Sequence, residues 1–378
     1  MTFRGLTWDH PRGYDALAEA ARRLNQGRAT PLITWDKQPL EGFESAPIAE
    51  LAARYDLLVL DHPHIGEAVA SDCLHPLEDL FSETQIAEWK AQSVGPSLTS
   101  YACEGKTWAL PLDVATQVMA RRANKVATPP DRWEAVLEIA AHVPVAQSLA
   151  GPHAVLSLFS MVAGMGGTVG EEILLPGEEA EEALTTMHRL YALRPKGSER
   201  LNPIALSEAM VGGDIALVPL LFGYVNYAQT GMAGQLSFSD TIGVSTPGTG
   251  GVIGGTGVGF AKHSKPSPGL LDHIVWLMRP DTQRQFIPSF GGQPSARAAW
   301  QDQGVNKAWG GCYQQCLATA ENALLRPRFD GYIAFQTQAS ERLRQALETS
   351  ENENTALAAL RQLWRDARAN ASSPLESS

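Results

Sequence analysis

The feature that most constrains the fold is a regular alternation of apolar strands and amphipathic helices in the first 110 residues. Strand-like runs at residues 4–9, 32–36 and 56–61 alternate with helical patterns at 14–24, 48–55 and 67–73. The run at 56–61 is wholly apolar between two aspartates, which predicts a strand buried on both faces. Strands that alternate with helices form parallel sheets with right-handed crossovers. We therefore predict an α/β fold.

The rest of the chain also contains predicted strands and helices, which indicate a second α/β unit. Residues 106–110 and 114–121 are expected to form strands that leave the first unit, and Asp131 is expected to cap a helix at 132–141. Further helices are predicted at 155–164, 179–193, 206–212 and 270–278, and strands at 214–220 and 258–261. Another helix is expected from residue 279, and the last 70 residues read as mostly helical with a frayed polar end at 372–378.

Length and composition exclude several classes of protein. A chain of 378 residues is long enough for two domains, and 44% hydrophobic with 19% charged residues is typical of globular proteins. The net charge of −11 repels a phosphate backbone, and there is no basic stripe with interleaved aromatic residues, so we expect no nucleic-acid partner. No stretch reaches the ~18 consecutive apolar residues that a membrane span needs.

Two of the four cysteines, Cys312 and Cys316, lie four positions apart, which places both thiols on one face of a helix. This spacing is compatible with half of a metal site or with a redox pair. However, zinc sites use C-x-x-C pairs or nearby histidines, and an i,i+4 helical pair rarely meets disulfide geometry. We favour core thiols and expect no metal.

The first residues do not have the pattern of an export signal, which needs a basic start, an apolar segment and a cleavage site. Instead, the chain leads directly into the first predicted strand. Two expectations stay open: a cytoplasmic protein, or a mature form with a new initiating methionine.

Polar clusters follow the three predicted strands of the first unit. They contain Trp8, Asp9 and His10, then Trp35 and Asp36, then Asp61, His62 and His64. In open parallel α/β sheets, ligands bind beyond the carboxyl ends of the strands. Carboxylates accept hydrogen bonds from sugar hydroxyls, and indole rings cover the apolar faces of a sugar ring. The clusters therefore favour a carbohydrate site.

Other interpretations of these clusters remain open. An aspartate after a strand is often a helix cap, and Trp8 or Trp35 are equally compatible with the core. The acids and histidines Asp9, His10, Asp61, His62 and His64 are also compatible with a metal site. Pro63 and the absence of a fixed downstream partner make us prefer the sugar site, and we expect no cofactor. A glycosidase needs two carboxylates at a defined separation, which a sequence does not provide.

A glycine-rich stretch at 245–259 invites a nucleotide interpretation, which its details exclude. It lacks the Gly-Lys-Ser/Thr ending of a P-loop, and it leads into a strand rather than the helix of a dinucleotide fingerprint. No G-x-S-x-G or H-E-x-x-H motif occurs anywhere in the chain. We expect these glycines to let the backbone approach a ligand or flex where the chain crosses between units.

Four segments together resemble a known family. They are residues 56–80, ending in a Leu-x-Pro-Leu turn; 104–118 (EGKTWALPLDVATQV); 206–217 (LSEAMVGGDIAL); and 254–265 (GGTGVGFAKHSK) with the following helix and Pro280-Asp281. This order resembles the extracellular solute-binding proteins of bacterial ABC importers, the carbohydrate-type family that includes maltose-binding protein.

The resemblance implies a two-lobed, type II periplasmic-binding-protein-like fold. It implies an N-terminal lobe of residues 1–112 with 255–302 and a C-terminal lobe of residues 113–254 with 303–378, joined by a multi-segment hinge. Such lobes close on a ligand between them, and the closed form docks on a membrane permease without covalent chemistry. The resemblance further implies a monomer with a carbohydrate ligand and a periplasmic or other extracytoplasmic location.

By position in the family, the ligand contacts fall after each strand and in four later segments. They are Asp9, His10, Arg12, Trp35, Asp36, Asp61, His62 and His64; Asp113 and Gln117 past the first crossing; Phe222, Tyr224 and Asn226 in an aromatic loop; Gly255 and Thr256 in the glycine loop; Gly292 in the next loop; and Tyr332 in the C-terminal segment.

One departure concerns the family's tyrosine-tyrosine-asparagine stretch, which residues 119–124 (MARRAN) replace here. The acidic and histidine-rich site favours a substituted or amine-bearing sugar. The alternative to a binding protein is an intracellular sensor or an enzyme on the same scaffold, with Asp61 or Asp9 and His62 as acid–base groups.

Overall fold

A computed structural model describes residues 2–170 and 172–371, and the chain divides into two compact units. The first unit contains the N-terminal segment up to Ala115, then Gly254–Asn306 and Arg328–Asp330. The second contains Thr116–Ile253, Lys307–Pro327 and the chain from Gly331 onward. The expected lobes have boundaries within a few residues of these units. The expected N-terminal lobe does not include Arg328–Asp330, which belongs to the first unit. Their role as lobes that close on a ligand stays a prediction.

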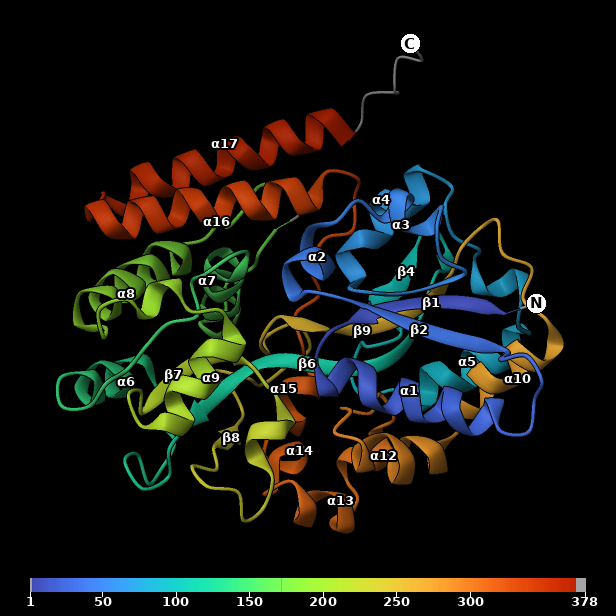
Figure 1. Ribbon diagram of the computed structural model, residues 1–378. Helices are drawn as coiled ribbons and strands as arrows, with labels where there is room; N and C mark the ends of the chain where they lie inside the picture. Colours follow the sequence, from blue (N-terminus) through green and yellow to red (C-terminus); the bar gives the residue numbers. More distant parts are fainter. Residues whose placement is uncertain (1, 171, 372–378) are drawn as a thin grey trace. The chain divides into compact units, whose positions relative to one another are not determined.

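The first unit is an α/β sandwich (Figure 1). Its main elements are β1 (Phe3–Trp8), α1 (Pro11–Asn25), β2 (Ile33–Gln38), α2 (Leu40–Ser45), α3 (Ile48–Ala52), β3 (Leu57–Leu60), α4 (Ile65–Ala70), α5 (Glu83–Gln92), β4 (Ala102–Cys103), β5 (Lys106–Thr107), the start of β6 (Leu110–Arg121), most of β9 (Ile253–Phe260), α10 (Pro268–Leu277), a π-helix (Thr282–Phe286), α11 (Ile287–Ser289), α12 (Arg297–Trp300) and most of α13 (Gln303–Ala308).

The sheet of the first unit has the order β2-β1-β3-β9. Strands β2, β1 and β3 are parallel, with Leu6 opposite Leu58, which confirms the predicted strand–helix alternation. All of β3 is buried, as its apolar run predicts. Strand β9 is antiparallel to β3, because the chain enters it from the second unit rather than through a helical crossover. Helix α1 lies on one face of the sheet and helices α2 to α4 on the other (Figure 1).

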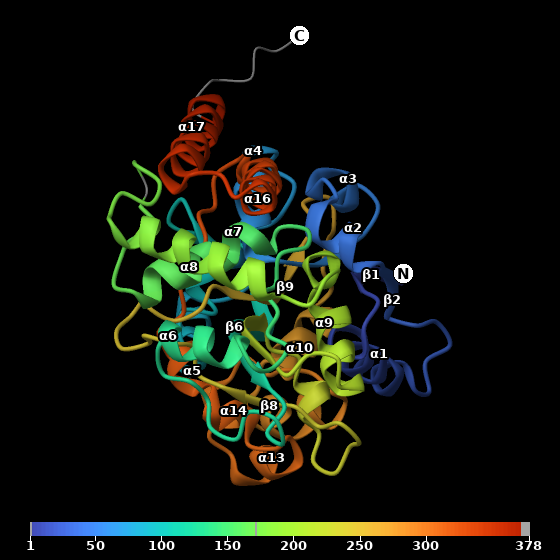
Figure 2. The same ribbon diagram turned by 90° about the vertical axis from the view of Figure 1, so that its left-hand side faces the viewer.

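The second unit combines a small antiparallel sheet with a group of long helices. Its elements are the end of β6, α6 (Trp133–Ala140), α7 (His153–Gly164), α8 (Glu179–Leu193), α9 (Pro203–Gly212), β7 (Leu217–Phe222), β8 (Ser237–Ser239), α14 (Cys312–Gln315), α15 (Leu317–Glu321), α16 (Tyr332–Thr349) and α17 (Glu353–Ala371). Strand β6 pairs with both β7 and β8. Helix α16 packs against α7 and α17, and Figure 2 shows α16 and α17 side by side.

Strands β6 and β9 carry the chain between the units, and the glycine-rich stretch packs against β6. A Cβ atom on Gly255 would lie 2.2 Å from the carbonyl oxygen of Asp113, and one on Gly251 would lie 1.9 Å from that of Gln117. Gly255 also has a φ of +107°, which favours glycine. The close approach that these glycines allow is therefore to the backbone of β6. Gly255 and Thr256 lie inside β9, so their expected position in a loop is wrong.

Other local predictions need correction. Helix α6 begins at Trp133 with Arg132 as its N-cap residue, so Asp131 is not the cap. The run at 106–110 is divided between β5 and β6. The expected helix after residue 279 includes a π-helical turn, and residues 372–378 lie outside the described residues. Cys312 and Cys316 are buried, and burial raises the pKa of Cys316, as befits core thiols.

Candidate functional site

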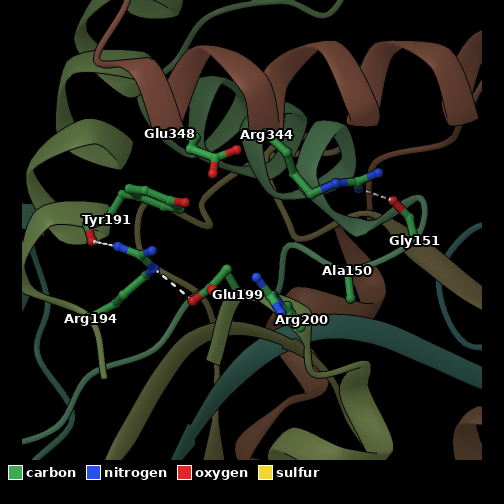
Figure 3. Close-up of a pocket in the computed structure, with 8 residues that line it drawn as sticks. All are labelled: Ala150, Gly151, Tyr191, Arg194, Glu199, Arg200, Arg344 and Glu348. Atoms are coloured by element: carbon green, nitrogen blue, oxygen red, sulfur yellow. Dashed lines mark hydrogen bonds and ion pairs between the residues drawn. The ribbon is translucent and has the colours of Figure 1, made fainter. Parts of the chain in front are cut away.

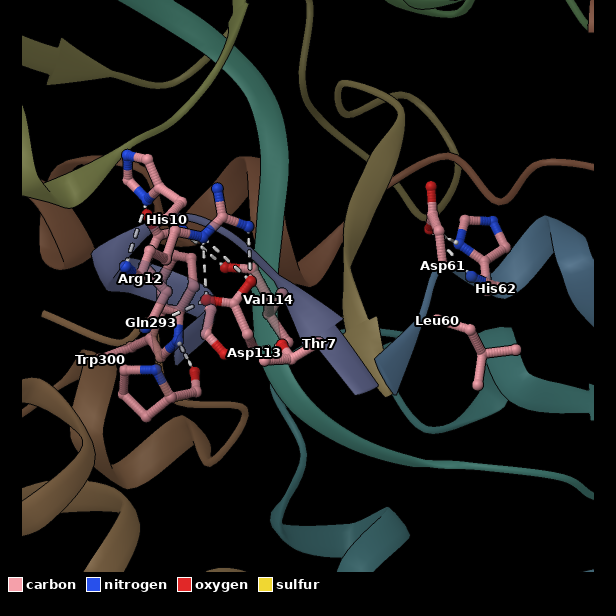
Figure 4. A network of polar contacts seen from close by, with 12 residues as sticks. Thr7, His10, Arg12, Leu60, Asp61, His62, Asp113, Val114, Gln293 and Trp300 are labelled. Atoms are coloured by element: carbon pink, nitrogen blue, oxygen red, sulfur yellow. Dashed lines mark hydrogen bonds and ion pairs between the residues drawn. The ribbon is translucent and has the colours of Figure 1, made fainter. Parts of the chain in front are cut away.

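A buried ion pair between Arg12 and Asp113 organises one group of polar residues in the first unit (Figure 4). Arg12 Nε donates to the two oxygens of Asp113 at 3.0 and 2.9 Å, and Nη2 donates to Oδ1 at 2.5 Å. Gln293 donates its N–H to Asp113 Oδ2 at 3.2 Å and its Nε2 to the carbonyl oxygen of Val114 at 2.9 Å. Because the carboxylate is neutralised and accepts several hydrogen bonds within the unit, it acts first as a link between α1, β6 and the loop at Gln293.

The start of helix α1 fixes the position of Arg12. His10 is the N-cap residue, and its Nδ1 accepts a hydrogen bond from the N–H of Arg12 at 3.2 Å. The His10 ring stacks on Trp8 with centroids 5.0 Å apart and an interplanar angle of 7°. A Cβ on Gly13 would lie 1.9 Å from Trp8 Nε1, so the first turn requires glycine there.

His10 is neutral at pH 7. Burial, and then the nearby Arg12 charge, lower the pKa of His10 to about 4. Since Nδ1 accepts from the backbone, the neutral ring carries its proton on Nε2 and presents a donor there.

Asp61 and His62 form a second group, which Figure 4 shows apart from the Arg12 ion pair. Asp61 follows β3, and its Oδ1 accepts from the N–H of His62 at 2.8 Å and lies 3.2 Å from His62 Nδ1. His62 is 1% exposed and meets the edge of Tyr101 at 6.3 Å, while the Asp61 side chain is 18% exposed. His64 is also buried, with Nδ1 3.8 Å from Glu67. Asp61 is thus the residue of this group whose side chain is partly exposed.

The predicted contacts after the second strand are misplaced, because β2 continues to Gln38. Trp35 and Asp36 lie inside the strand. A Cβ on Gly5 would lie 2.4 Å from the Trp35 ring, so Trp35 is a core residue packed on β1. Asp36 forms an ion pair with Arg4 at 2.6 Å. Asp9 does follow β1, but its exposed carboxylate pairs with Lys37 at 2.6 Å.

In the second unit, Gln117 is fully buried and links three segments. Its Oε1 accepts from Ser160 Oγ at 2.6 Å, and its Nε2 donates to Ser157 Oγ at 3.2 Å. Ser160 Oγ in turn accepts from the N–H of Val252 at 2.9 Å. The amide therefore joins β6, α7 and the glycine-rich stretch.

Aromatic residues gather at the end of β7. Phe222 is the last residue of the strand and meets the edge of His153 at 5.6 Å. Tyr224 and Tyr227 contact each other at 6.4 Å, and burial raises the pKa of Tyr227 to about 12. Asn226 lies between them in a short 3₁₀ turn. Phe222 and Asn226 are half-buried, whereas Tyr224 is 4% exposed.

The two remaining predicted residues are buried. Gly292 lies in the loop before Gln293, where a Cβ would meet Ile287 at 2.6 Å. Tyr332 begins α16, is 0% exposed and packs on Phe335 at 5.9 Å.

Several residues of these groups were not predicted from the sequence. Gln293 follows a glycine pair in a loop that was recognised, so its position carried a usable signal. Ser157 and Ser160 are three residues apart on an otherwise apolar helix, and such serines are too common to indicate a site. His153 and Tyr227 gave no pattern of their own.

In 2–170 and 172–371, no three or more His, Cys, Asp or Glu side chains are grouped to hold a metal ion. Within the same ranges, no helix has the length and hydropathy to cross a membrane.

The chain is similar to known proteins both in sequence and in fold. The sequence model of a family described as bacterial extracellular solute-binding protein matches residues 43–310. No curated protein sequence matches significantly.

Solved structures share the fold over nearly the whole chain. Maltose-bound MalE3 of T. maritima has a TM-score of 0.80 at 16% identity and covers 98% of this chain and 99% of its own. A ribitol complex of an ABC transporter solute-binding protein from Agrobacterium radiobacter has a TM-score of 0.80 at 17% identity, covering 98% of both chains. UgpB of Mycobacterium tuberculosis with glycerophosphocholine has a TM-score of 0.74 at 13% identity, covering 98% and 99%. The fold is therefore the α/β type II fold. The family model matches most of the chain, so this protein belongs to the bacterial extracellular solute-binding proteins.

Proposed function

We propose that this chain is the substrate-binding component of an ABC importer and that it binds a carbohydrate or sugar derivative for delivery to a membrane permease. The family match over residues 43–310 is the observation that carries this proposal. The three solved structures named above hold maltose, ribitol and glycerophosphocholine, which all bear hydroxyl groups. Under this proposal the protein works outside the cytoplasm as a monomer and converts nothing.

The ligand contacts that we propose belong to the groups described above, and all of them except the buried Tyr224 are partly exposed. In the first unit, Asp61 supplies a carboxylate that accepts from sugar hydroxyls, and His10 supplies a donor at Nε2 beside the Trp8 ring. In the second unit, Phe222 and Tyr224 supply aromatic surface and Asn226 an amide. The family resemblance supports contacts from both units.

The buried polar groups have a supporting role in this proposal. The Arg12–Asp113 pair and Gln117 have their hydrogen bonds directed to other parts of their own units. They hold the strand ends and β6 in position, so the contact residues meet the ligand without reordering.

The enzyme alternative assigns acid–base chemistry to Asp61 and His62. Such a base must reach the proton that it takes, directly or through one water. The His62 ring is 1% exposed and packs against Tyr101, so it is placed to orient Asp61 rather than to meet a substrate. We therefore favour binding without turnover.

The substitution Asp61→Asn tests the proposed contact. Asparagine retains the oxygen that accepts from the N–H of His62 but loses the charge, so the fold should persist while a charge-assisted bond to ligand is lost. We expect about tenfold weaker binding by calorimetry of whichever of maltose, ribitol or glycerophosphocholine binds the wild-type protein. Asp72→Asn, at an exposed carboxylate paired with Lys262, is the matched control. Equal affinities of both variants and wild type would place the site elsewhere.

A further inference from the structure

A cavity of about 580 Å³ lies in the second unit (Figure 3). Its lining residues are Ala150, Gly151, Tyr191, Arg194, Glu199, Arg200, Arg344 and Glu348. This volume falls within the range of sites for small molecules. None of these residues is among the ligand contacts that we propose for the carbohydrate.

Two of the three arginines are held in fixed positions by contacts with neighbouring residues. Arg344 Nη1 donates to the carbonyl oxygens of Leu149 at 2.9 Å and Gly151 at 2.5 Å. Arg194 Nη1 donates to the carbonyl oxygen of Tyr191 at 2.6 Å, and its guanidinium lies 3.5 Å from the centre of that ring. Because these contacts set the guanidinium planes before anything binds, less side-chain entropy is lost on binding.

The acidic side chains of the cavity do not neutralise the arginines fully. Glu199 accepts hydrogen bonds from Arg194 Nε and from the N–H of Gly197, both at 2.9 Å, so its carboxylate is paired within residues 194–199. The Arg200 side chain is 87% exposed, and its Nε lies 3.8 Å from Glu199 Oε1, which is too far for a hydrogen bond. The Glu348 side chain is exposed. The lining carries one more positive than negative charge in a chain of net charge −11.

Arg344 shows the same shortage of negative charge. Burial lowers the pKa of Arg344, and a charge on Glu341 offsets this only in part. A bound anion would compensate the charge directly.

We propose that this cavity binds a small molecule through its phosphate or carboxylate group, with Arg200 and Arg344 as the donors. Guanidinium groups bind both kinds of anion through paired N–H donors. The Tyr191 hydroxyl and the Glu348 carboxylate lie at the same cavity (Figure 3), and they favour a ligand that also carries hydroxyl or amino groups.

Calorimetry of the full-length protein with inorganic phosphate and with succinate tests the proposal and distinguishes the two anions. The titrations use a buffer of low ionic strength without phosphate, since salt screens such contacts. We expect at least one of the two anions to bind. Arg200→Gln should weaken that binding about tenfold, because it removes a charged donor with few contacts of its own.

A variant that binds the anion more tightly provides a result that damage to the fold does not produce. Glu348→Gln removes a repelling carboxylate and should tighten anion binding several-fold. Arg132→Gln, at an exposed arginine paired with Asp131 and Glu138, is the matched control and should change nothing. The proposal is overturned if neither anion binds, or if Arg200→Gln and Glu348→Gln both bind like the control. Carbohydrate affinity of the same variants should equal that of wild type, whichever way the anion result falls.

Discussion

At the scale of single residues, the Arg12–Asp113 pair is the most buried ion pair that the structure describes in the first unit. Both side chains are about 5% exposed, so removing one charge leaves the other buried without its opposite charge. We predict that Asp113→Asn lowers the free energy of unfolding by about 3–5 kcal/mol, measured by urea denaturation. Asp36→Asn at the exposed Arg4–Asp36 pair should cost less than ~1 kcal/mol. Similar losses for both variants would show that the buried pair is not a structural link.

The buried His273 is expected to make the free energy of unfolding depend on pH. Its ring is 5% exposed and stacks on Trp276, and burial lowers the pKa of His273 to about 4. Above pH 6.5 the ring is neutral in both folded and unfolded chains, so pH has no effect through this group. Between pH 6.5 and 4 the unfolded chain takes up the proton first, and folding loses up to roughly 3 kcal/mol.

The variant His273→Phe isolates this effect. Phenylalanine retains an aromatic ring beside Trp276 but does not titrate. The difference in free energy of unfolding between wild type and variant should be constant above pH 7 and turn against wild type as the pH falls toward 4. A difference that stays constant down to pH 4 would contradict the buried, neutral histidine.

At the scale of secondary-structure elements, the glycine-rich stretch has a structural role that a substitution can measure. A methyl group on Gly255 would lie 2.2 Å from the carbonyl oxygen of Asp113, and φ there is +107°. Gly105 has a φ of +75° with nothing within 4 Å of its Cβ position. We predict that Gly105→Ala costs about 1–2 kcal/mol of stability from backbone strain alone. Gly255→Ala should cost more, because β9 must also move away from β6, and equal losses in thermal or urea unfolding would contradict the close packing.

The elements of the first unit were predictable where their burial produced a clear pattern. Strand β3 is buried along its whole length, and its apolar run between Asp56 and Asp61 marked both ends. Strand β2 is at the edge of the sheet, and its last three residues, Asp36, Lys37 and Gln38, are all polar. A polar run without periodicity is typical of a loop, so the sequence does not indicate that the strand continues to Gln38.

The candidate site shows the same limit. Asp61 directly follows β3 and His10 is the N-cap residue of α1, as their places after predicted strands indicated, and their role as ligand contacts stays a prediction. Gln117 was expected to contact ligand, but its amide is bonded to Ser157 and Ser160 on a helix distant in sequence. Such a partner choice depends on tertiary packing, which no local pattern encodes.

At the scale of the whole molecule, the units are built from separated stretches of chain. Length alone suggested two domains, and only the combined family segments implied that residues 255–302 belong with the N-terminal lobe, while the first unit contains Gly254–Asn306. The family and the fold were therefore accessible from the sequence. The identity of the ligand is not, since the solved structures of this fold hold solutes as different as maltose and glycerophosphocholine.

The most direct test of the account is a binding and recovery experiment on the purified protein. Calorimetric titration with a panel of maltose, ribitol, mannitol and glycerophosphocholine is followed by NMR of the recovered solute. We predict that at least one of these solutes binds with a stoichiometry of one and is recovered chemically unchanged. Failure of the whole panel to bind, or conversion of a bound solute into product, would contradict a carbohydrate-binding role without turnover.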